Sequence, residues 1–221
     1  MTTTPVSKRG REDQNDTREE ILAQAAKLIF DQGYEATTMR QIAGRLKIKP
    51  GSLYYHFESK QDILFELVTT TIRPLTAGAK QLCSHEPGPE LKLAAIVVNH
   101  VVLHALKPTT ATLADSELRS LAGHLRDEHL RARDEYEMLV IEALRRGARA
   151  GRFDVLDPKL VAYALISQSS NVGIWYDPGG RLRLERIAAI HVAMAMRLVA
   201  AEPIADADVR RICDAARAFH S

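Results

Sequence analysis

The chain has 221 residues, 46% of them hydrophobic, and its 30 basic and 28 acidic residues give a formal net charge of +2. A chain of this length and composition can bury a core of its own, which excludes a small scaffold that depends on disulfides. The two cysteines, Cys83 and Cys213, lie far apart, and no secretory signal pattern follows Met1. We therefore expect a globular protein in a reducing, cytoplasmic compartment.

The longest strongly apolar run, residues 187–201, is shorter than a bilayer requires and contains His191 and Arg197. This run is typical of a buried helix, so we expect no membrane partner. Positive charge is concentrated elsewhere, in residues 36–60, where five basic residues accompany a single acidic one. By itself, such a cluster is as compatible with a solvated face as with a binding surface.

The first 14 residues are polar and basic, without an apolar period, and we expect them to form a disordered tail. A first helix is expected from Asp16, as N-cap, to Gly33, with Glu19 completing a capping box. A second, shorter helix follows Thr37 and Thr38, and a fourth follows Ser59. Between these two lies PGSLYYHF, residues 50–57, which Pro50 can open as a third helix of fewer than three turns.

Two short helices joined by a tight turn and packed against a longer one form a helix-turn-helix arrangement. In the third helix only Leu53 and Phe57 have the spacing of a buried face, and we expect Tyr54 beside them in the core. Tyr55 and His56 then point outward. Because so short a helix is not stable alone, the pattern indicates a segment that presents its outer side chains to a nucleic acid.

The segments ILAQAAKLIFDQGYEA and TTMRQIAGRLKIKPGSLYYHFESKQDIL resemble the N-terminal DNA-binding domain of the TetR family of transcriptional regulators. The likeness runs from Thr17 to about Leu67. Two positions differ from the family pattern: Lys47 replaces the usual glycine of the turn, and Lys49 replaces the usual Ser or Thr cap of the recognition helix. A non-glycine residue in a left-handed turn costs about 1 kcal/mol, so the turn remains possible.

In a helix-turn-helix, the start of the second helix faces base edges in the major groove. Lys49 and Ser52 are therefore the candidates for base contact, and Gly51 would let the backbone approach the duplex. The basic tail would enter an adjacent minor groove. The resemblance implies the same surface, and the candidates for phosphate contact are Thr38, Arg40, Tyr55, His56 and Lys60.

The rest of the chain is predicted to be helical, which makes the fold class all-α. We expect three parts: the tail (1–14), a helix-turn-helix domain (15–60) and a ligand-binding and dimerisation domain (61–221). The larger domain should contain helices at 91–106, 113–129, 131–150, 158–175 and 183–201, with a short one from Asp206. Asp157 followed by Pro158 is a strong helix start.

The last long helix is apolar almost all round, so it must be covered on more than one side. A second copy of the chain would cover the outer side, and the TetR resemblance also implies a homodimer. We predict that the interface lies on the last two long helices and includes Leu165, Ser169, Val172, Ile187, Ile190, Met194 and Leu198.

The stretch NVGIWYDPGGRL resembles, more weakly, a branch of the family that responds to acyl-CoA thioesters, although Trp175 and Tyr176 would also fit as stacked rings at a dimer edge. His100 and His104 lie one turn apart and have the spacing of two zinc ligands, with His124 or His129 as a third from another helix. Without paired cysteines or a carboxylate at fixed spacing we expect no metal and no cofactor. We predict instead a ligand cavity lined by Asn99, His100, Leu103, His104, Arg119, Tyr136 and Trp175.

These patterns lead to the hypothesis of a dimeric repressor that binds a palindromic DNA operator and is released by a small apolar or acyl-CoA-like effector. An enzyme is the first alternative, but the chain has no phosphate-binding glycine loop, nucleophile elbow or metal motif. A helical partner-binding protein is the second alternative, and it predicts no apolar cavity in the larger domain.

Overall fold

The computed structural model describes residues 8–221, with side chains from Thr17 onward. Within this range the chain is helical and contains no strand, so the predicted all-α class is confirmed. The helices are α1 (Lys8–Gln32), α2 (Met39–Leu46), α3 (Pro50–His56), α4 (Lys60–Ser84), α5 (Gly88–Leu106), α6 (Pro108–Ser116), the 3-10 turn η1 (Leu118–Ser120), α7 (Gly123–Arg149), α8 (Pro158–Ser170), α9 (Val172–Trp175), α10 (Leu184–Leu198) and α11 (Asp206–His220).

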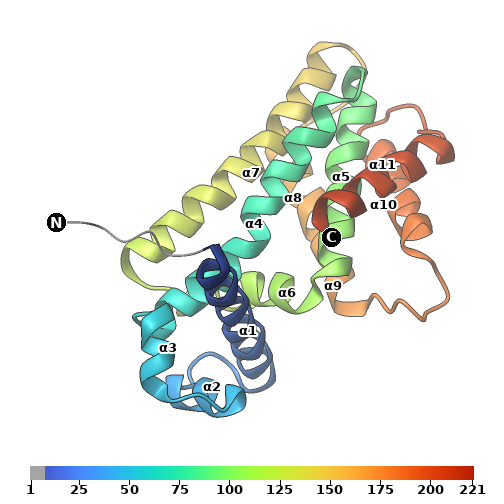
Figure 1. Cartoon of the computed structure of the whole chain (residues 1–221). Coiled ribbons are helices and arrows are strands. Elements are labelled where there is room, and N and C mark those ends of the chain that lie inside the picture. Colours follow the sequence, from blue (N-terminus) through green and yellow to red (C-terminus); the bar gives the residue numbers. More distant parts are fainter. Residues whose placement is uncertain (1–7) are drawn as a thin grey trace.

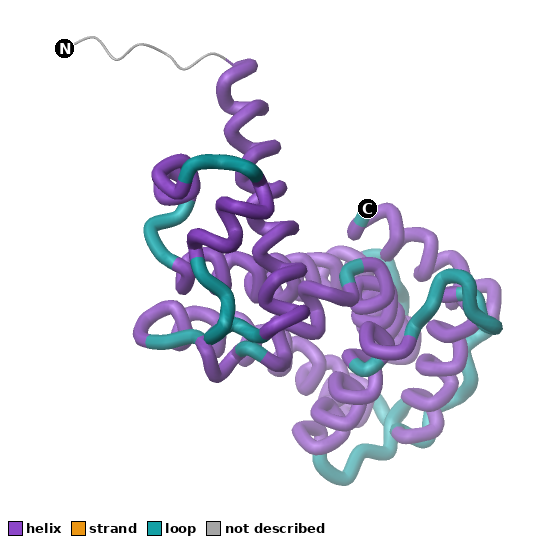
Figure 2. The backbone as a smooth tube through the Cα atoms, turned by 90° about the horizontal axis from the view of Figure 1, so that it is seen from below, coloured by secondary structure: helices purple, strands orange, loops and turns teal. Residues whose placement is uncertain are grey.

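Helices α1, α2 and α3 gather at one end of the molecule, and α4 leads from them into a larger group of helices (Figure 1). Seen from below, the same two groups are joined by helical segments, while the loops lie mainly at the edges (Figure 2). In the larger group α5 is central, since it packs against α4, α7, α8, α10 and α11. A small helical domain is thus attached to a larger one built around α5.

Helix α5 is the one described helix that is long and apolar enough to cross a membrane by length and hydropathy alone. However, 72% of its most apolar stretch is buried among other helices. Every residue from Leu93 to Ala105 is buried. This is the burial that a central helix shows in a globular domain.

Two hydrophobic cores follow this division, but α4 belongs to both. Residues of α4 from Ile63 to Val68 pack into the smaller core, and those from Ile72 to Leu82 pack into the larger one. The smaller core also contains Leu113 and Ala114 of α6 and Leu121 after η1. The predicted domain division at residue 60 stays a prediction, because packing is continuous across that position.

Several predicted helix starts are confirmed. The Thr38 hydroxyl accepts a hydrogen bond from the Gln41 backbone N–H at 3.2 Å, and the Gln41 side chain accepts one from the Thr38 backbone at 2.8 Å, which completes a capping box. Ser59 caps α4, since its hydroxyl accepts a hydrogen bond from the Asp62 backbone N–H at 3.2 Å and donates one to the Asp62 carboxylate at 2.8 Å. Asp157 Oδ1 accepts bonds from the first two free N–H groups of α8.

The start of α1 was predicted wrongly. The helix begins at Lys8 and not at Asp16, which lies within it, so the disorder expected for residues 1–14 does not hold from Lys8 onward. The rest of the predicted tail lies outside the described residues. The predicted end is correct, because α1 stops at Gln32 and Gly33 follows with φ 83°.

The helix predicted at 113–129 does not exist as one element. Helix α6 ends at Ser116, η1 follows, and Leu121 is extended because its side chain enters the smaller core. Helix α7 starts at Gly123 and continues to Arg149, so the break that was predicted near residue 130 is absent from it. The helix predicted at 158–175 is divided into α8 and α9, and α11 has 15 residues where a short helix was expected.

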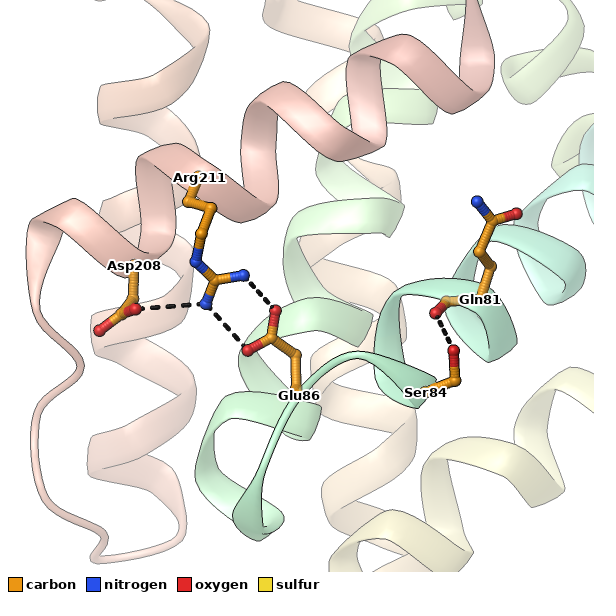
Figure 3. A network of polar contacts seen from close by, with 5 residues as sticks. All are labelled: Gln81, Ser84, Glu86, Asp208 and Arg211. Atoms are coloured by element: carbon orange, nitrogen blue, oxygen red, sulfur yellow. Dashed lines mark hydrogen bonds and ion pairs between the residues drawn. The ribbon is translucent and has the colours of Figure 1, made fainter.

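An ion pair attaches α11 to the loop before α5 (Figure 3). The Arg211 guanidinium donates to both oxygens of Glu86, at 2.6 and 2.9 Å, and also to Asp208 at 3.2 Å. Glu86 is only 6% exposed. Because a bidentate pair satisfies a carboxylate with fixed geometry, this contact holds the C-terminal helix against the core.

Lys47 forms the turn between α2 and α3 in the left-handed conformation, with φ 56° and ψ 31°. The backbone N–H groups of Ile48 and Lys47 donate to the carbonyls of Ala43 and Gly44, which is the Schellman pattern with Lys47 at the position that glycine usually occupies. The departure from the family pattern therefore leaves the turn geometry intact, at the steric cost of a side chain in this region.

We predict that Lys47→Gly raises the free energy of unfolding, measured by urea titration, by about 0.5–1 kcal/mol, because it removes this strain at an exposed site. Lys49→Gly is the matched control. Lys49 is also exposed, but its backbone is extended (φ −71°), so glycine relieves no strain there and should change the free energy of unfolding by at most about 0.3 kcal/mol. Equal effects of the two substitutions would contradict a strained turn.

Candidate DNA-binding surface and ligand cavity

The recognition helix α3 is anchored by two side chains. Leu53 is fully buried and Phe57 is 3% exposed, as predicted, and the Arg18 guanidinium lies 4.6 Å from the centre of the Phe57 ring. Tyr55 is 73% exposed, which confirms its outward position. The prediction of a core position for Tyr54 is wrong, because it is 53% exposed. A seven-residue helix can turn only one narrow face inward, and Leu53 occupies it, while Phe57 enters the core as the C-cap residue that follows.

The predicted DNA-contact residues lie on α2 and α3 and in the turns that precede these helices, except Lys60, which begins α4. Thr38, Arg40, Lys49, Ser52 and Tyr55 are exposed, while His56 is half-buried, with its ring edge-on to that of Tyr55. A side-chain carbon built onto Gly51 would meet no atom within 4 Å. The protein's own packing therefore does not require glycine there, which favours the predicted close approach of DNA to this backbone.

Lys60 is used inside the protein. Its ammonium donates to the backbone carbonyls of Tyr34 and Thr37, both at 2.8 Å, and lies 3.9 Å from the centre of the Tyr34 ring. Lys60 thus fastens the loop between α1 and α2 to the start of α4. A phosphate contact by Lys60 stays a prediction, as do those by Thr38, Arg40, Tyr55 and His56.

A polar junction, which was not predicted from the sequence, lies between the two domains. The Gln61 amide donates to the Tyr34 hydroxyl at 2.8 Å and to the Ser120 carbonyl at 2.7 Å, and it accepts from the Ala122 N–H at 3.1 Å. Ser120 in turn donates to Glu117. The amide nitrogen and the amide oxygen of the Gln61 side chain thus join three parts of the chain: the loop after α1, helix α4 and the segment around η1. No local sequence signal marks such a residue.

A cavity of about 170 Å³ lies between α4, α5, α6, α7 and α8. Of the predicted ligand residues, His100, His104 and Tyr136 line it. The rest of its wall includes apolar side chains of α4, α6 and α8, together with polar and charged groups: Thr71, Ile72, Leu75, Ala111, Ala114, Asp115, His129, Arg133, Glu137, Tyr163, Ile166, Ser167 and Ser170.

The other four predicted ligand residues lie elsewhere. Asn99 is held by the Leu75 carbonyl and by His220, at 2.9 and 2.8 Å, and Leu103 is fully buried in the core. Arg119 is exposed in η1, near the smaller domain. Trp175 is 53% exposed and borders a separate hollow beside Tyr176. The sequence located the helix that carries the cavity wall but not which of its faces is turned to the cavity.

The histidines of the cavity are buried and neutral. His100 Nδ1 lies 2.8 Å from the Tyr136 hydroxyl, and its Nε2 lies 3.0 Å from the Ser170 hydroxyl. The His104 ring stacks on it with 4.2 Å between ring centres. Burial, followed by the neighbouring His104 and His191, holds the pKa of His100 well below its usual value. Burial, followed by Arg133, lowers the pKa of His129 to about 4.

No group of three or more His, Cys, Asp or Glu side chains with the geometry of a metal site occurs in the described part of the chain.

Four of the seven predicted interface residues are packed inside the protomer. Leu165, Ser169, Val172 and Ile187 are each at most 3% exposed, because this face of α8, α9 and α10 meets α5. The other three lie on the outer face of α10: Ile190 (37% exposed), Met194 (38%) and Leu198 (46%). The prediction therefore mixed the inner and outer faces of these helices, and the location of the interface on them stays a prediction. On α8 and α9 the exposed apolar residues are instead Leu160, Tyr163, Ile174 and Trp175.

A stability measurement can test the neutral histidines. Their pKa is lower in the folded chain than the unfolded value of 6.5, so the unfolded state binds more protons and stability falls as the pH drops from about 6.5 toward 4. Each such histidine contributes at most about 1.4 kcal/mol per pH unit. We expect His129→Phe to flatten the pH dependence of urea unfolding between pH 7 and pH 5. His124→Phe, at an exposed position of the same helix, should leave it unchanged. An unchanged slope in His129→Phe would contradict a neutral His129.

Two family models match the chain. The model of bacterial regulatory proteins of the tetR family matches residues 21–67, and that of the tetracyclin repressor-like C-terminal domain matches residues 86–199, more than half of the chain. The chain belongs to the TetR family. It is a DNA-binding transcriptional regulator, and the predicted family is confirmed.

Similar proteins include the HTH-type transcriptional repressor KstR2 of Mycolicibacterium smegmatis, which is 28% identical over 182 residues, 81% of this chain and 88% of the relative. A tetR-family regulatory protein from Rhodococcus RHA1 has a similar structure, with a TM-score of 0.77, 27% identity, and 82% of this chain and 96% of that chain covered. AibR in complex with isovaleryl coenzyme A and operator DNA shares the fold, with a TM-score of 0.73 and 24% identity over 84% of this chain and 99% of that chain.

Proposed function

We propose that this regulator is a dimeric repressor that binds a palindromic operator through α3 and is released by a small apolar or acyl-CoA-like effector. The observation that carries the proposal is the exposed surface around Gly51, where Arg40, Lys49, Ser52 and Tyr55 leave the backbone open to close approach. Cationic and hydroxyl groups on such a surface suit phosphates and base edges. The relatives that are named as repressors support repression over activation.

The outer faces of α8, α9 and α10 support a homodimer. Exposed apolar side chains on these helices, among them Ile174, Ile190 and Met194, would be removed from water by a second copy. A two-fold axis through this surface would present two α3 helices to half-sites about 34 Å apart.

Helix α6 supports a route from the cavity to the DNA-binding domain. Ala111, Ala114 and Asp115 line the cavity, while Leu113 and Ala114 pack into the smaller core. A ligand that changes the position of α6 would therefore also change how α1 and α4 pack in the smaller core. Release requires that the ligand bind the form with misplaced recognition helices more tightly than the operator-bound form. The isovaleryl coenzyme A bound by AibR makes acyl thioesters the first effectors to test.

We predict that Arg40→Ala weakens binding to the DNA upstream of the protein's own gene and lowers the slope of log Kd against log salt by about one, since one phosphate contact is lost. Tyr55→Ala should also weaken binding, by about tenfold, because the proposed contact of its ring and hydroxyl with the sugar-phosphate backbone of the DNA is lost. Gel-shift titrations at several salt concentrations measure both effects. The control is Arg210→Ala, because Arg210 is an exposed arginine on α11.

Binding by Arg40→Ala and Tyr55→Ala with the affinity of the unaltered protein would refute the proposed surface. The effector is tested in the same titrations by adding isovaleryl coenzyme A and longer acyl thioesters. If none of them weakens the complex, the thioester part of the proposal is wrong, whereas the DNA-binding part is unaffected.

A further inference from the structure

The hydrogen bonds of His104 fix the position of its proton. Its Nδ1 lies 2.9 Å from the backbone carbonyl of His100, and a carbonyl oxygen can only accept, so Nδ1 carries the hydrogen. Burial lowers the pKa of His104, which keeps the ring neutral. Nε2 is then a bare acceptor. It has no partner among residues 17–221, although His104 lines the cavity.

Two further side chains of the cavity wall lack partners. Neither ring nitrogen of His129, which is 1% exposed, has a hydrogen-bond partner in the described chain, and the same holds for the hydroxyl of Thr71, which is 5% exposed. They belong to α7 and α4, which Arg73 and Glu128 join by an ion pair nearby. Because buried polar groups are normally satisfied, their presence at one cavity indicates a ligand that both donates and accepts hydrogen bonds.

The charges of the wall argue against an anionic group in the cavity. Asp115 and Glu137 line it together with a single cation, Arg133. The three histidines offer no positive charge, since burial lowers the pKa of each. A carboxylate only accepts hydrogen bonds. Its lone pairs would therefore face the lone pair of His104 Nε2 with no hydrogen between them. An ether or a thioester carbonyl has the same shortcoming, because neither can donate.

The size of the cavity limits what enters. Its volume of about 170 Å³ is below the roughly 300–1,000 Å³ that encloses a drug-sized ligand, so it holds only a part of a larger molecule. Ile72, Leu75, Ala111 and Ile166 belong to the apolar half of the wall, and polar side chains form the other half. The part that enters is therefore short and carries a polar group on a hydrocarbon frame.

We propose that this cavity holds an uncharged, hydroxyl-bearing hydrocarbon group of the effector, whose O–H donates to His104 Nε2, and that it discriminates against carboxylates. The inference rests on the proposed effector role of the cavity. It narrows the effector class to alcohols or to hydroxylated acyl groups whose remainder lies outside the cavity. His129 and Thr71 are the groups that a hydroxyl oxygen or a second polar atom would satisfy.

The test uses three matched probes on the full chain: 3-methylbutan-1-ol, its methyl ether, and 3-methylbutanoate. The alcohol alone can donate a hydrogen bond without carrying charge. Titrations are followed in long-range ¹H–¹⁵N spectra of protein labelled with ¹⁵N-histidine, where the unprotonated Nε2 of His104 should move toward the protonated-type value. We expect the alcohol to bind about fivefold more tightly than the ether and about tenfold more tightly than the carboxylate.

His104→Phe keeps a ring to stack on His100 but removes the acceptor, so the alcohol and the ether should then bind within about twofold of each other. His124→Phe, on the exposed surface, should keep the preference for the alcohol. The comparison of probes on the unaltered chain stands even if the His104 variant fails to fold. Equal binding of alcohol and ether, tightest binding of the carboxylate, or no binding of any probe would overturn the inference.

These titrations contain no DNA, so they fail or succeed independently of the gel-shift experiment. If the alcohol binds as predicted and the operator is not bound, the cavity chemistry stands and the proposed function fails. If the operator is bound and the alcohol is not, the reverse holds.

Discussion

The DNA-binding domain is completed by side chains that come from far along the chain. Leu113 and Leu121, which are 1% and 2% exposed, fill its core together with residues of α1, α2, α3 and α4. Gln61 then ties Tyr34 of the same core to the Ser120 and Ala122 backbone. A core of this size is only marginally stable by itself, so the position of α3 depends on where α6 and η1 lie.

Under the proposed function, this dependence would let one small cavity influence a distant surface. Helix α6 carries Ala111 and Asp115 in the cavity wall and Leu113 in the DNA-binding core, so both sites share one short element. Packed cores resist gradual deformation, and a displaced α6 would have to carry the smaller domain with it. Both ring nitrogens of His129 in this cavity lack a hydrogen-bond partner in the described chain.

The elements predicted from sequence were those with strong local signals. Thr38, Ser59 and Asp157 cap helices as their sequence context indicates, and Leu53 and Phe57 face inward because i, i+4 spacing defines a short helix's buried side. The errors and omissions arose where tertiary contacts decide. Leu121 leaves a helical pattern to enter another core, and Lys60 turns to the carbonyls of Tyr34 and Thr37. On α8 and α10 nearly every side chain is small or apolar, so the pattern does not distinguish the face toward α5 from the outer one.

The shared core is tested most directly by native-state hydrogen exchange of Leu113→Ala, a substitution within α6. A buried Leu→Ala change costs about 2–5 kcal/mol in the unit that contains the side chain. The structure predicts that the amides of α2 and α3 exchange more than tenfold faster in this variant, although both helices lie some 60 residues or more earlier in the chain. Faster exchange confined to α5, α10 and α11, with α2 and α3 unchanged, would contradict the account.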